Sequence, residues 1–385
     1  MNDEFYMQRC YELAVKAAGN VSPNPMVGAV LVHDNIIIGE GWHKKSGEAH
    51  AEVNCIASVK KEDRYFIEKS ILYVSLEPCA HFGKTPPCAD LIIKHKIKKI
   101  VIGCLDPFTK VNGKGIEKLK AAGVEVNLTS IEMEAKGREI NKRFFTYHTQ
   151  QRPYIILKWA QSRNGKIATS SNSLEAQILD SENSTGLSNK RIFALADLKK
   201  PLSTGKEPRL LISNQYTNIL VHQWRSEEAA ILIGTNTALF DNPELTTRLW
   251  PGNSPVRLIM DSNLKLPPTL KVFNQPVPTI IFNTLKQEEK GNLLYYQLKE
   301  DVNLVPQIMK ALYQMKIKSV LVEGGRNLLQ SFIDMELWDE ARILTNFELQ
   351  VTNGLSAPVL KDNIMVLDQQ LLSDKIEIYK HHTKD

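Results

Sequence analysis

One imidazole, two thiols and one carboxylate lie close together in the sequence. His50 and Glu52 belong to a His-Ala-Glu triplet, and Cys79 and Cys88 each follow a proline. A catalytic zinc takes three protein ligands and leaves its fourth tetrahedral position to a water, whose pKa the metal lowers to about 7. His50, Cys79 and Cys88 are therefore the predicted zinc ligands. Glu52, which need not be a ligand, is the predicted proton shuttle.

Two other interpretations of these residues stay open. A lone histidine or cysteine is more often a packed side chain than a ligand, and Cys10, Cys55 and Cys104 are expected to be buried thiols. A structural zinc would need a fourth protein ligand, which His81 could supply, and Glu52 would then have no role. Ligand type, order and the flanking prolines together favour the catalytic zinc.

Length and composition predict a soluble protein of two domains. The chain has 385 residues, more than one hydrophobic core usually supports, and 43% of them are apolar. The N-terminus lacks the features of a signal peptide, and no stretch approaches the ~20 apolar residues that span a bilayer. An odd cysteine count argues against a disulfide framework, so we expect a cytoplasmic protein without a membrane partner. The net charge of +5 is scattered, which suits a phosphorylated small substrate and predicts no nucleic-acid partner.

Alternating strands and helices are expected to position the four residues. The expected elements are a helix over 7–18, strands over 26–33 and 36–39, a helix over 46–58, a strand over 71–76, a helix over 88–95, a strand over 100–105, a helix over 116–122 and a strand over 124–128. His50 and Glu52 would lie in the first turns of their helix. Cys79 and Cys88 would lie at helix N-termini, which lower a thiol pKa and favour the thiolate that binds zinc. The alternation predicts a layered α/β domain that ends near residue 150.

Three strings in the N-terminal half resemble one known family. SLEPCAHFGKTPPC, from Ser75 to Cys88, has the prolyl-cysteines of zinc deaminases with an extended loop between them, and it resembles the deaminase half of the bifunctional riboflavin-biosynthesis proteins. PNPMVGAV (23–30) and DPFTKVNGKG (106–115) resemble substrate-pocket segments of that family, in the same order. The resemblance implies a cytidine-deaminase-like α/β fold for residues 1–150 and zinc-dependent deamination of a phosphorylated diaminopyrimidine.

Asn24 lies between two prolines, in a rigid loop from which its amide could read a base edge. A turn asparagine that bonds its own backbone is the other interpretation. The resemblance favours contact with the substrate.

The second half restarts with a strand after Pro153. YIILKWAQSRNGKIA, from Tyr154 to Ala168, resembles the opening strand of the same family's reductase half. The resemblance implies a dihydrofolate-reductase-like α/β domain over residues 151–385, which reduces a ribosyl group to ribityl with NADPH. A polar stretch over 169–208 without a strong period is expected to be an insertion with one helix near 192–198.

Two further segments, residues 210–248 and EGGRNLLQSF at 323–332, resemble the reductase's binding segments. By matched position the resemblance assigns Ala160, Thr237, Asp241 and Gly325 to NADPH, and Arg225, Leu245, Arg248 and Glu323 to the substrate. Taken alone, the glycine pair could be only a tight turn, and the arginines could be exposed residues in solvated ion pairs.

Two positions depart from the family pattern. Asn164 stands where the family usually has Asp, and Leu211 stands where it usually has Trp beside the cofactor. Loss of a stacking ring should weaken cofactor binding, so a deaminase with a non-catalytic reductase-like domain is one alternative.

The predicted function is that of a bifunctional, homo-oligomeric enzyme of riboflavin biosynthesis that uses Zn2+ and NADPH. A nucleoside or tRNA deaminase would need a basic, aromatic-lined surface, which the sequence does not show. A structural-zinc protein with a nucleotide-sensing second domain is a third alternative.

Overall fold

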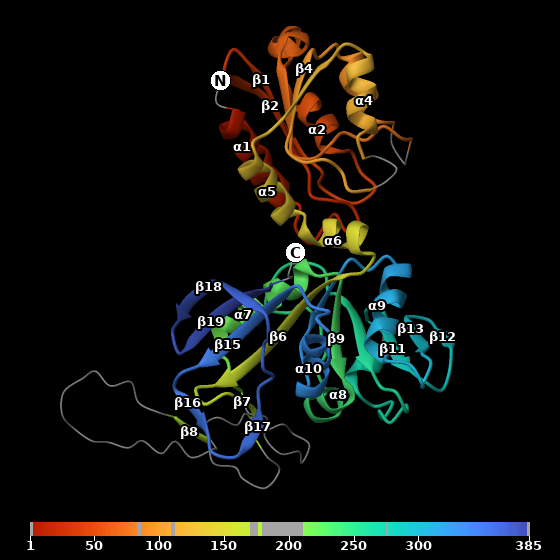
Figure 1. Ribbon diagram of the computed structural model, residues 1–385, viewed down its shortest axis with the longest axis vertical. Helices are drawn as coiled ribbons and strands as arrows, with labels where there is room; N and C mark the ends of the chain where they lie inside the picture. Colours follow the sequence, from red (N-terminus) through yellow and green to blue (C-terminus); the bar gives the residue numbers. More distant parts are fainter. Residues whose placement is uncertain are drawn as a thin grey trace, which may run out of the picture. The chain divides into compact units, whose positions relative to one another are not determined.

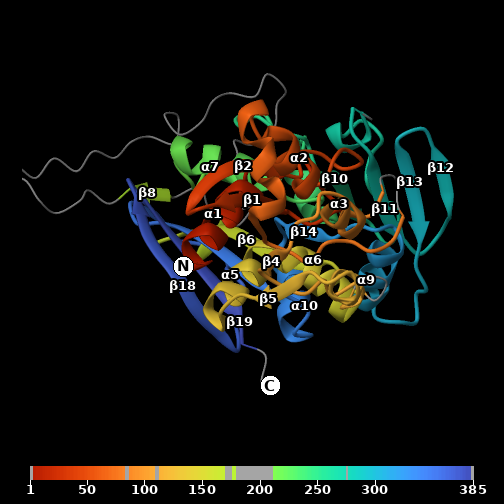
Figure 2. The same cartoon turned by 90° about the horizontal axis from the view of Figure 1, so that it is seen from above.

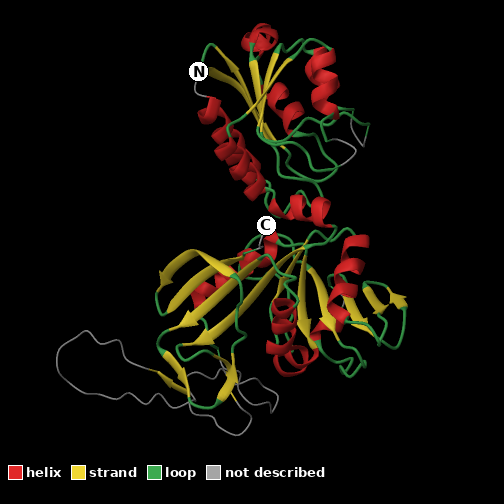
Figure 3. Ribbon diagram, viewed as in Figure 1, coloured by secondary structure: helices red, strands yellow, loops and turns green. Residues whose placement is uncertain are grey.

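A computed structural model of the chain describes residues 3–82, 86–108, 112–169, 176–178, 211–274 and 276–382. The chain forms two compact units, each a β-sheet covered by helices (Figures 1 and 3). Unit 1 comprises Met1–Pro153 and Leu312–Lys318, and unit 2 comprises Tyr154–Ala311 and Ser319–Asp385. The helix expected near 192–198, and nearly all of the expected insertion, lie outside the described residues. Within the described ranges, every helix is too short or too polar to cross a membrane.

The sheet of unit 1 has five strands. Their order is β2 (Ile36–Trp42), β1 (Gly28–His33), β3 (Ile71–Val74), β4 (Lys99–Ile102) and β5 (Glu125–Leu128). β1 is antiparallel to both of its neighbours, whereas β3, β4 and β5 are parallel. The carboxyl ends of β3 and β4 therefore lie side by side, and the segments that follow them meet at one edge of the sheet.

Helices cover both faces of this sheet (Figure 1). α1 (Asp3–Val15) and α5 (Ile131–Ile140) lie on one face, and α2 (Ala51–Ser58), α3 (Cys88–Lys94) and α4 (Lys114–Ala121) lie on the other. The side chains of β1 alternate accordingly, since Val30 packs toward α1 while Leu31 packs toward α2. The layered α/β arrangement expected from the sequence is therefore present.

Some expected local positions are wrong. The helix expected from residue 46 begins at Ala51, so His50 is its extended N-cap residue and lies outside its first turn. Cys79 follows β3 in a loop, so only Cys88 begins a helix. The remaining elements expected in this half are present, with ends shifted by a few residues. The polar stretch before Pro153 forms α6 (Lys142–Gln150).

The main sheet of unit 2 has ten strands. Their order is β12 (Glu288–Lys290), β13 (Leu293–Gln297), β11 (Thr279–Asn283), β10 (Val256–Met260), β9 (Ala230–Gly234), β14 (Ser319–Val322), β6 (Tyr154–Ser162), β15 (Glu340–Asn346), β19 (Asp374–His381) and β18 (Asn363–Leu371). The strands from β13 to β15 are parallel, and the others are antiparallel to their neighbours. Figure 2 shows β12 and β18 at opposite ends of this sheet.

The described residues of the second half contain the helices α7 (Gln215–Glu227), α8 (Thr235–Asp241), α9 (Leu304–Gln314) and α10 (Arg326–Asp334). α7 packs Val221 and Trp224 against side chains of β6, β14 and β15. The opening strand expected over 154–168 is divided, because a turn separates β6 from β7 (Lys166–Thr169). β7 pairs with β17 (Gly354–Ser356), and β8 (Ala176–Ile178) pairs with β16 (Leu349–Val351).

Candidate zinc site and reductase site

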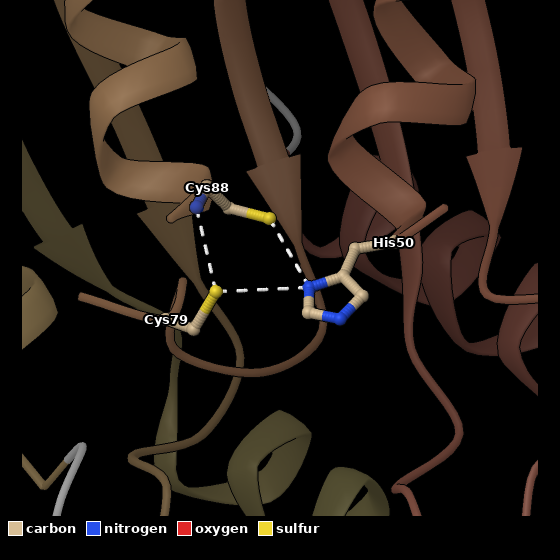
Figure 4. Close-up of side chains that lie close together, drawn as sticks. All are labelled: His50, Cys79 and Cys88. Carbon is tan, nitrogen blue, oxygen red and sulfur yellow. Dashed lines mark hydrogen bonds between the residues drawn. The ribbon is translucent and has the colours of Figure 1, made fainter. Parts of the chain in front are cut away.

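The structure brings the three predicted zinc ligands together. His50 Nδ1 lies 3.6 Å from Cys79 Sγ and 3.3 Å from Cys88 Sγ. In Figure 4 the imidazole and the two sulfur atoms point toward one another. A tetrahedral zinc with ordinary bonds to nitrogen and sulfur separates such atoms by about 3.5 Å, so the spacing fits a zinc ion.

Three different elements carry these ligands. His50 caps α2, Cys79 lies in the loop after β3, and Cys88 is the first residue of α3. The backbone N–H of Cys88 donates to Cys79 Sγ over 3.4 Å. Hydrogen bonds from the Cys88 thiol and from His50 lower the pKa of Cys79 to about 4, and the pKa of Cys88 is raised in return. The lowered pKa of Cys79 favours the thiolate, which is the form that zinc requires.

The ligand cluster leaves one coordination position free for a water. Within the described part of the chain, the metal-binding group consists of His50, Cys79 and Cys88, and it does not include His81. The ring of His81 lies beside Phe108, with 6.4 Å between the centroids. A three-ligand arrangement is typical of catalytic zinc and argues against a closed structural site.

Glu52 lies in the first turn of α2, two residues after His50, and is 3% exposed. Burial raises its pKa, and the nearby Cys79 sulfur raises it further. A carboxyl group whose pKa is raised toward neutrality can accept and return a proton at the working pH.

The Asn24 side chain is oriented by His43, a residue that was not predicted from the sequence. The Asn24 Nδ2 atom lies 3.0 Å from His43 Nε2, and His43 Nδ1 lies 3.1 Å from the carbonyl oxygen of Ala49. Because a carbonyl only accepts, His43 must donate through Nδ1 and accept the Asn24 amide at Nε2. Burial lowers the pKa of His43, which keeps this tautomer neutral. The Asn24 side chain therefore bonds His43, which differs from the turn interpretation.

In unit 2, two residues predicted to contact the substrate contact each other. Arg225 Nε and Nη2 donate to the two carboxylate oxygens of Glu323 over 2.7 and 2.6 Å. Both side chains are largely buried. Burial opposes ionisation of Glu323, but Arg225 outweighs it and holds the pKa of Glu323 below its ordinary value. The two residues therefore form a buried, bidentate ion pair.

The predicted cofactor residues lie where β9 and β14 end. Gly324 and Gly325 have φ of 153° and 62°, and a Cβ on either would lie within 3.5 Å of Thr237 Oγ1. Asp241 is four residues further along α8 and shares a helix face with Thr237. Ala160 lies on β6, the neighbour of β14. Glycine main chain at the carboxyl ends of parallel strands can approach a pyrophosphate closely, so this is a suitable place to bind one.

The other predicted substrate residues are placed less favourably. The Leu245 side chain is 2% exposed and packs in the core, which leaves its main chain, at φ 55°, to reach a ligand. Arg248 is about half exposed and bonds Glu244 over 2.6 Å, as expected for a solvated pair. Its backbone N–H donates to Nδ1 of buried His222, whose pKa is lowered to about 4 by burial and by Arg225 and Arg248. His222 is a second histidine that the sequence did not single out.

The two positions that depart from the family pattern differ in their surroundings. Asn164 Oδ1 accepts the hydroxyl of Ser162 and the backbone N–H of Val351. Asn164 Nδ2 donates to the carbonyl oxygen of Val351. It therefore joins the turn after β6 to β16. Leu211 is 57% exposed, so it adds little packing to the cofactor side.

Comparisons with known proteins match both halves of the chain. Residues 1–104 match the cytidine and deoxycytidylate deaminase zinc-binding region, and residues 153–346 match the RibD C-terminal domain. The riboflavin biosynthesis protein RibD of Aquifex aeolicus is 40% identical over 88% of this chain and 85% of its own length. The chain belongs to the RibD family. It is a bifunctional enzyme of riboflavin biosynthesis, with a zinc-dependent deaminase half and an NADPH-dependent reductase half.

Solved structures of RibD proteins have the same fold. The deaminase/reductase of Thermotoga maritima has a TM-score of 0.80 and 31% identity, with 98% of each chain covered. One form of Acinetobacter baumannii RibD has a TM-score of 0.78 and 26% identity, with 99% of each chain covered. The predicted fold class and the prediction of a bifunctional enzyme are confirmed. Neither a nucleoside or tRNA deaminase nor a structural-zinc protein fits a match of this extent.

Proposed function

We propose that residues 1–150 deaminate 2,5-diamino-6-ribosylamino-4(3H)-pyrimidinone 5′-phosphate and that residues 151–385 reduce the ribosyl group of the product to ribityl. The observation that carries this proposal is the cluster of three ligands, His50, Cys79 and Cys88, next to buried Glu52. The name of the Thermotoga maritima relative, a diaminohydroxyphosphoribosylaminopyrimidine deaminase and 5-amino-6-(5-phosphoribosylamino)uracil reductase, supports the choice of substrate.

In the deaminase half, His50, Cys79 and Cys88 would hold the zinc, which supplies an activated water when bound. Glu52 would take a proton from that water and deliver it to the departing amino group, because its buried carboxyl group lies two residues after the ligand His50 and is not itself a ligand. Asn24, oriented by His43, would bind the substrate.

In the reductase half, Thr237, Asp241, Gly325 and Ala160 would bind NADPH, which supplies the hydride. Arg225 and Glu323 would bind the substrate as one buried pair, together with Arg248 and the main chain of Leu245. The buried pair orients two opposite charges in advance, so a sugar phosphate would meet a site that is already ordered.

One assay tests both halves. Purified, zinc-loaded protein should release ammonia from the phosphorylated diaminopyrimidine, and it should oxidise NADPH when given the deaminated product. Ammonia release without NADPH oxidation would leave a deaminase with a non-catalytic second half. Absence of ammonia release from the zinc-loaded protein would contradict the proposed deaminase.

Location and assembly are further parts of the proposal. All five cysteines are free, which supports a reducing, cytoplasmic compartment. A homo-oligomer is supported by β18, an edge strand whose consecutive apolar side chains are exposed.

A further inference from the structure

Glu77 is a buried carboxylate that the proposed chemistry does not use. It is 4% exposed and lies two residues before Cys79. Its Oε1 accepts the backbone N–H groups of Gly115 and Ile116 over 2.9 and 3.4 Å. Its Oε2 accepts those of Gly113 and Asp106 over 3.0 and 3.3 Å. One carboxylate thus gathers four main-chain donors from residues 106–116, the range that holds the proposed substrate-pocket segment.

The start of α4 needs this carboxylate. The N-cap residue of α4 is Gly113, whose φ of 79° suits glycine and which has no side chain to cap the helix. The first N–H groups of a helix have no partner within the helix, and a negative charge is favourable there. Glu77 supplies the missing acceptor from a distant part of the chain.

α4 also lies directly against the turn that carries Cys79. A Cβ added to Gly115 would come within 2.1 Å of the carbonyl oxygen of Pro78, so the helix backbone and this peptide are in close contact. On the other side, the carbonyl of Cys79 accepts the N–H of Ala89 in α3. The turn is therefore fixed between the N-terminal ends of two helices.

We infer that Glu77 is a positioning residue for deamination, because it ties the turn that holds a zinc ligand to the loop that contacts the substrate. The inference rests on the proposed function of the deaminase half. Glu77 touches neither reacting group in this role. Its effect follows from geometry, since a displacement of about 1 Å between reacting groups can lower a rate about 100-fold.

The test is the Glu77→Gln variant of the full chain, loaded with zinc. The amide keeps the size of the side chain but turns an NH2 group toward main-chain donors, which should release part of residues 106–116. Because the displaced loop would lose hydrogen bonds to the charged substrate, we expect the KM for the phosphorylated diaminopyrimidine to rise by about 10- to 100-fold, with one zinc per chain retained. NADPH oxidation on the deaminated product should not change, and it reports that the second half of the chain is folded.

Asp261→Asn is the matched control. Asp261 is 2% exposed and accepts the backbone N–H groups of Lys265 and Leu266 in unit 2, so its substitution disturbs another buried carboxylate that binds main-chain donors of a loop. This control should lower the melting temperature and leave the deaminase KM unchanged. Wild-type deaminase kinetics in Glu77→Gln, with only a lower melting temperature, would show that Glu77 merely stabilises the fold.

A second variant covers the case in which Glu77→Gln does not fold. Gly115→Ala keeps the carboxylate but pushes α4 away from Pro78, so the substrate KM should rise here as well. An unchanged KM in folded Gly115→Ala would overturn the inference. If the wild-type protein releases no ammonia, the proposed function fails first, and the role of Glu77 fails with it.

Discussion

Ionisable side chains at both sites already have partners from distant parts of the chain. Cys79 Sγ lies 3.6 Å from His50 Nδ1 and accepts the backbone N–H of Cys88, and Arg225 is held by Glu323, 98 residues further along the chain. A buried charge without a partner is costly. Substituting one member of such a pair therefore removes its own contacts and also leaves the other member uncompensated.

Glu52→Gln should separate metal binding from catalysis. The carboxylate is not part of the ligand cluster, so zinc content should stay at one per chain. Loss of the proton shuttle should lower deaminase turnover by about 100-fold or more. Glu48→Gln, an exposed change four residues earlier, is the control and should leave turnover unchanged. Loss of zinc in Glu52→Gln, or turnover near that of wild type, would contradict the assigned role.

Arg225 and Arg248, the two arginines of the proposed reductase site, should differ strongly in their effect on stability. Arg225→Ala leaves Glu323 buried and unpaired, so the free energy of unfolding should fall by about 3–5 kcal/mol. Arg248→Ala breaks an ion pair that is half exposed, which should cost under about 1 kcal/mol. Urea denaturation of the two variants measures the difference. Equal losses would show that the Arg225–Glu323 pair is not the buried structural element described above.

The sequence predicts single residues well where the chemistry is carried by side-chain type. The zinc ligands are recognisable because few residue types bind zinc, and their spacing and prolines add a second constraint. Glu77, His43 and His222 were not predicted, because their partners are mainly main-chain groups or residues far away in the chain. Backbone N–H groups are present at almost every position, so the sequence does not reveal which of them a side chain will bind.

At the scale of elements, the position of the site side chains depends on how closely their helices approach the sheet. β2 packs on α2 through glycine: a Cβ on Gly41 would lie 2.2 Å from the backbone nitrogen of Cys55 and 2.7 Å from the carbonyl oxygen of Ala51. The backbone of α2 therefore contacts the backbone of β2. α2 begins directly after His50 and carries Glu52. For residues 7–128 the element types were predictable from periodicity, whereas α5 and α6 were not predicted. The start of α2 was not, because the sequence does not reveal that His50 takes an extended conformation.

Gly41→Ala should impair the zinc site without changing any ligand. The new methyl group would push α2 and with it His50, so we expect weaker zinc binding and slower deamination. Competition with a chelator measures the zinc affinity. Gly123→Ala is the control: its φ of 83° strains an alanine, but nothing lies within 4 Å of the added Cβ. Similar losses of zinc affinity in both variants would mean that general destabilisation, and not the position of α2, is responsible.

At the scale of the whole molecule, the edge strand β18 carries an exposed apolar surface. Among the described residues it pairs with β19 alone, and Ile364, Met365, Val366 and Leu367 are each 39–51% exposed. Its other side is the end of the ten-stranded sheet (Figure 2). The sequence did not predict this edge, because sheet order depends on long-range pairing that local periodicity does not contain. Proteins rarely leave a long apolar edge exposed, since it invites association.

We expect a second copy of the chain to cover β18, because two copies of one edge strand can meet across a two-fold axis with the same side chains on each side. Ile364→Lys places a charge in this surface and should convert the proposed homo-oligomer into a monomer. An exposed substitution of this kind should change the free energy of unfolding by at most about 0.5 kcal/mol. Sedimentation at micromolar concentration measures the change. Ile131→Lys, at an apolar side chain of α5 that is 82% exposed, should leave the assembly intact. A wild-type protein that sediments as a monomer, or an Ile364→Lys variant that remains associated, would show that β18 is not the contact between copies.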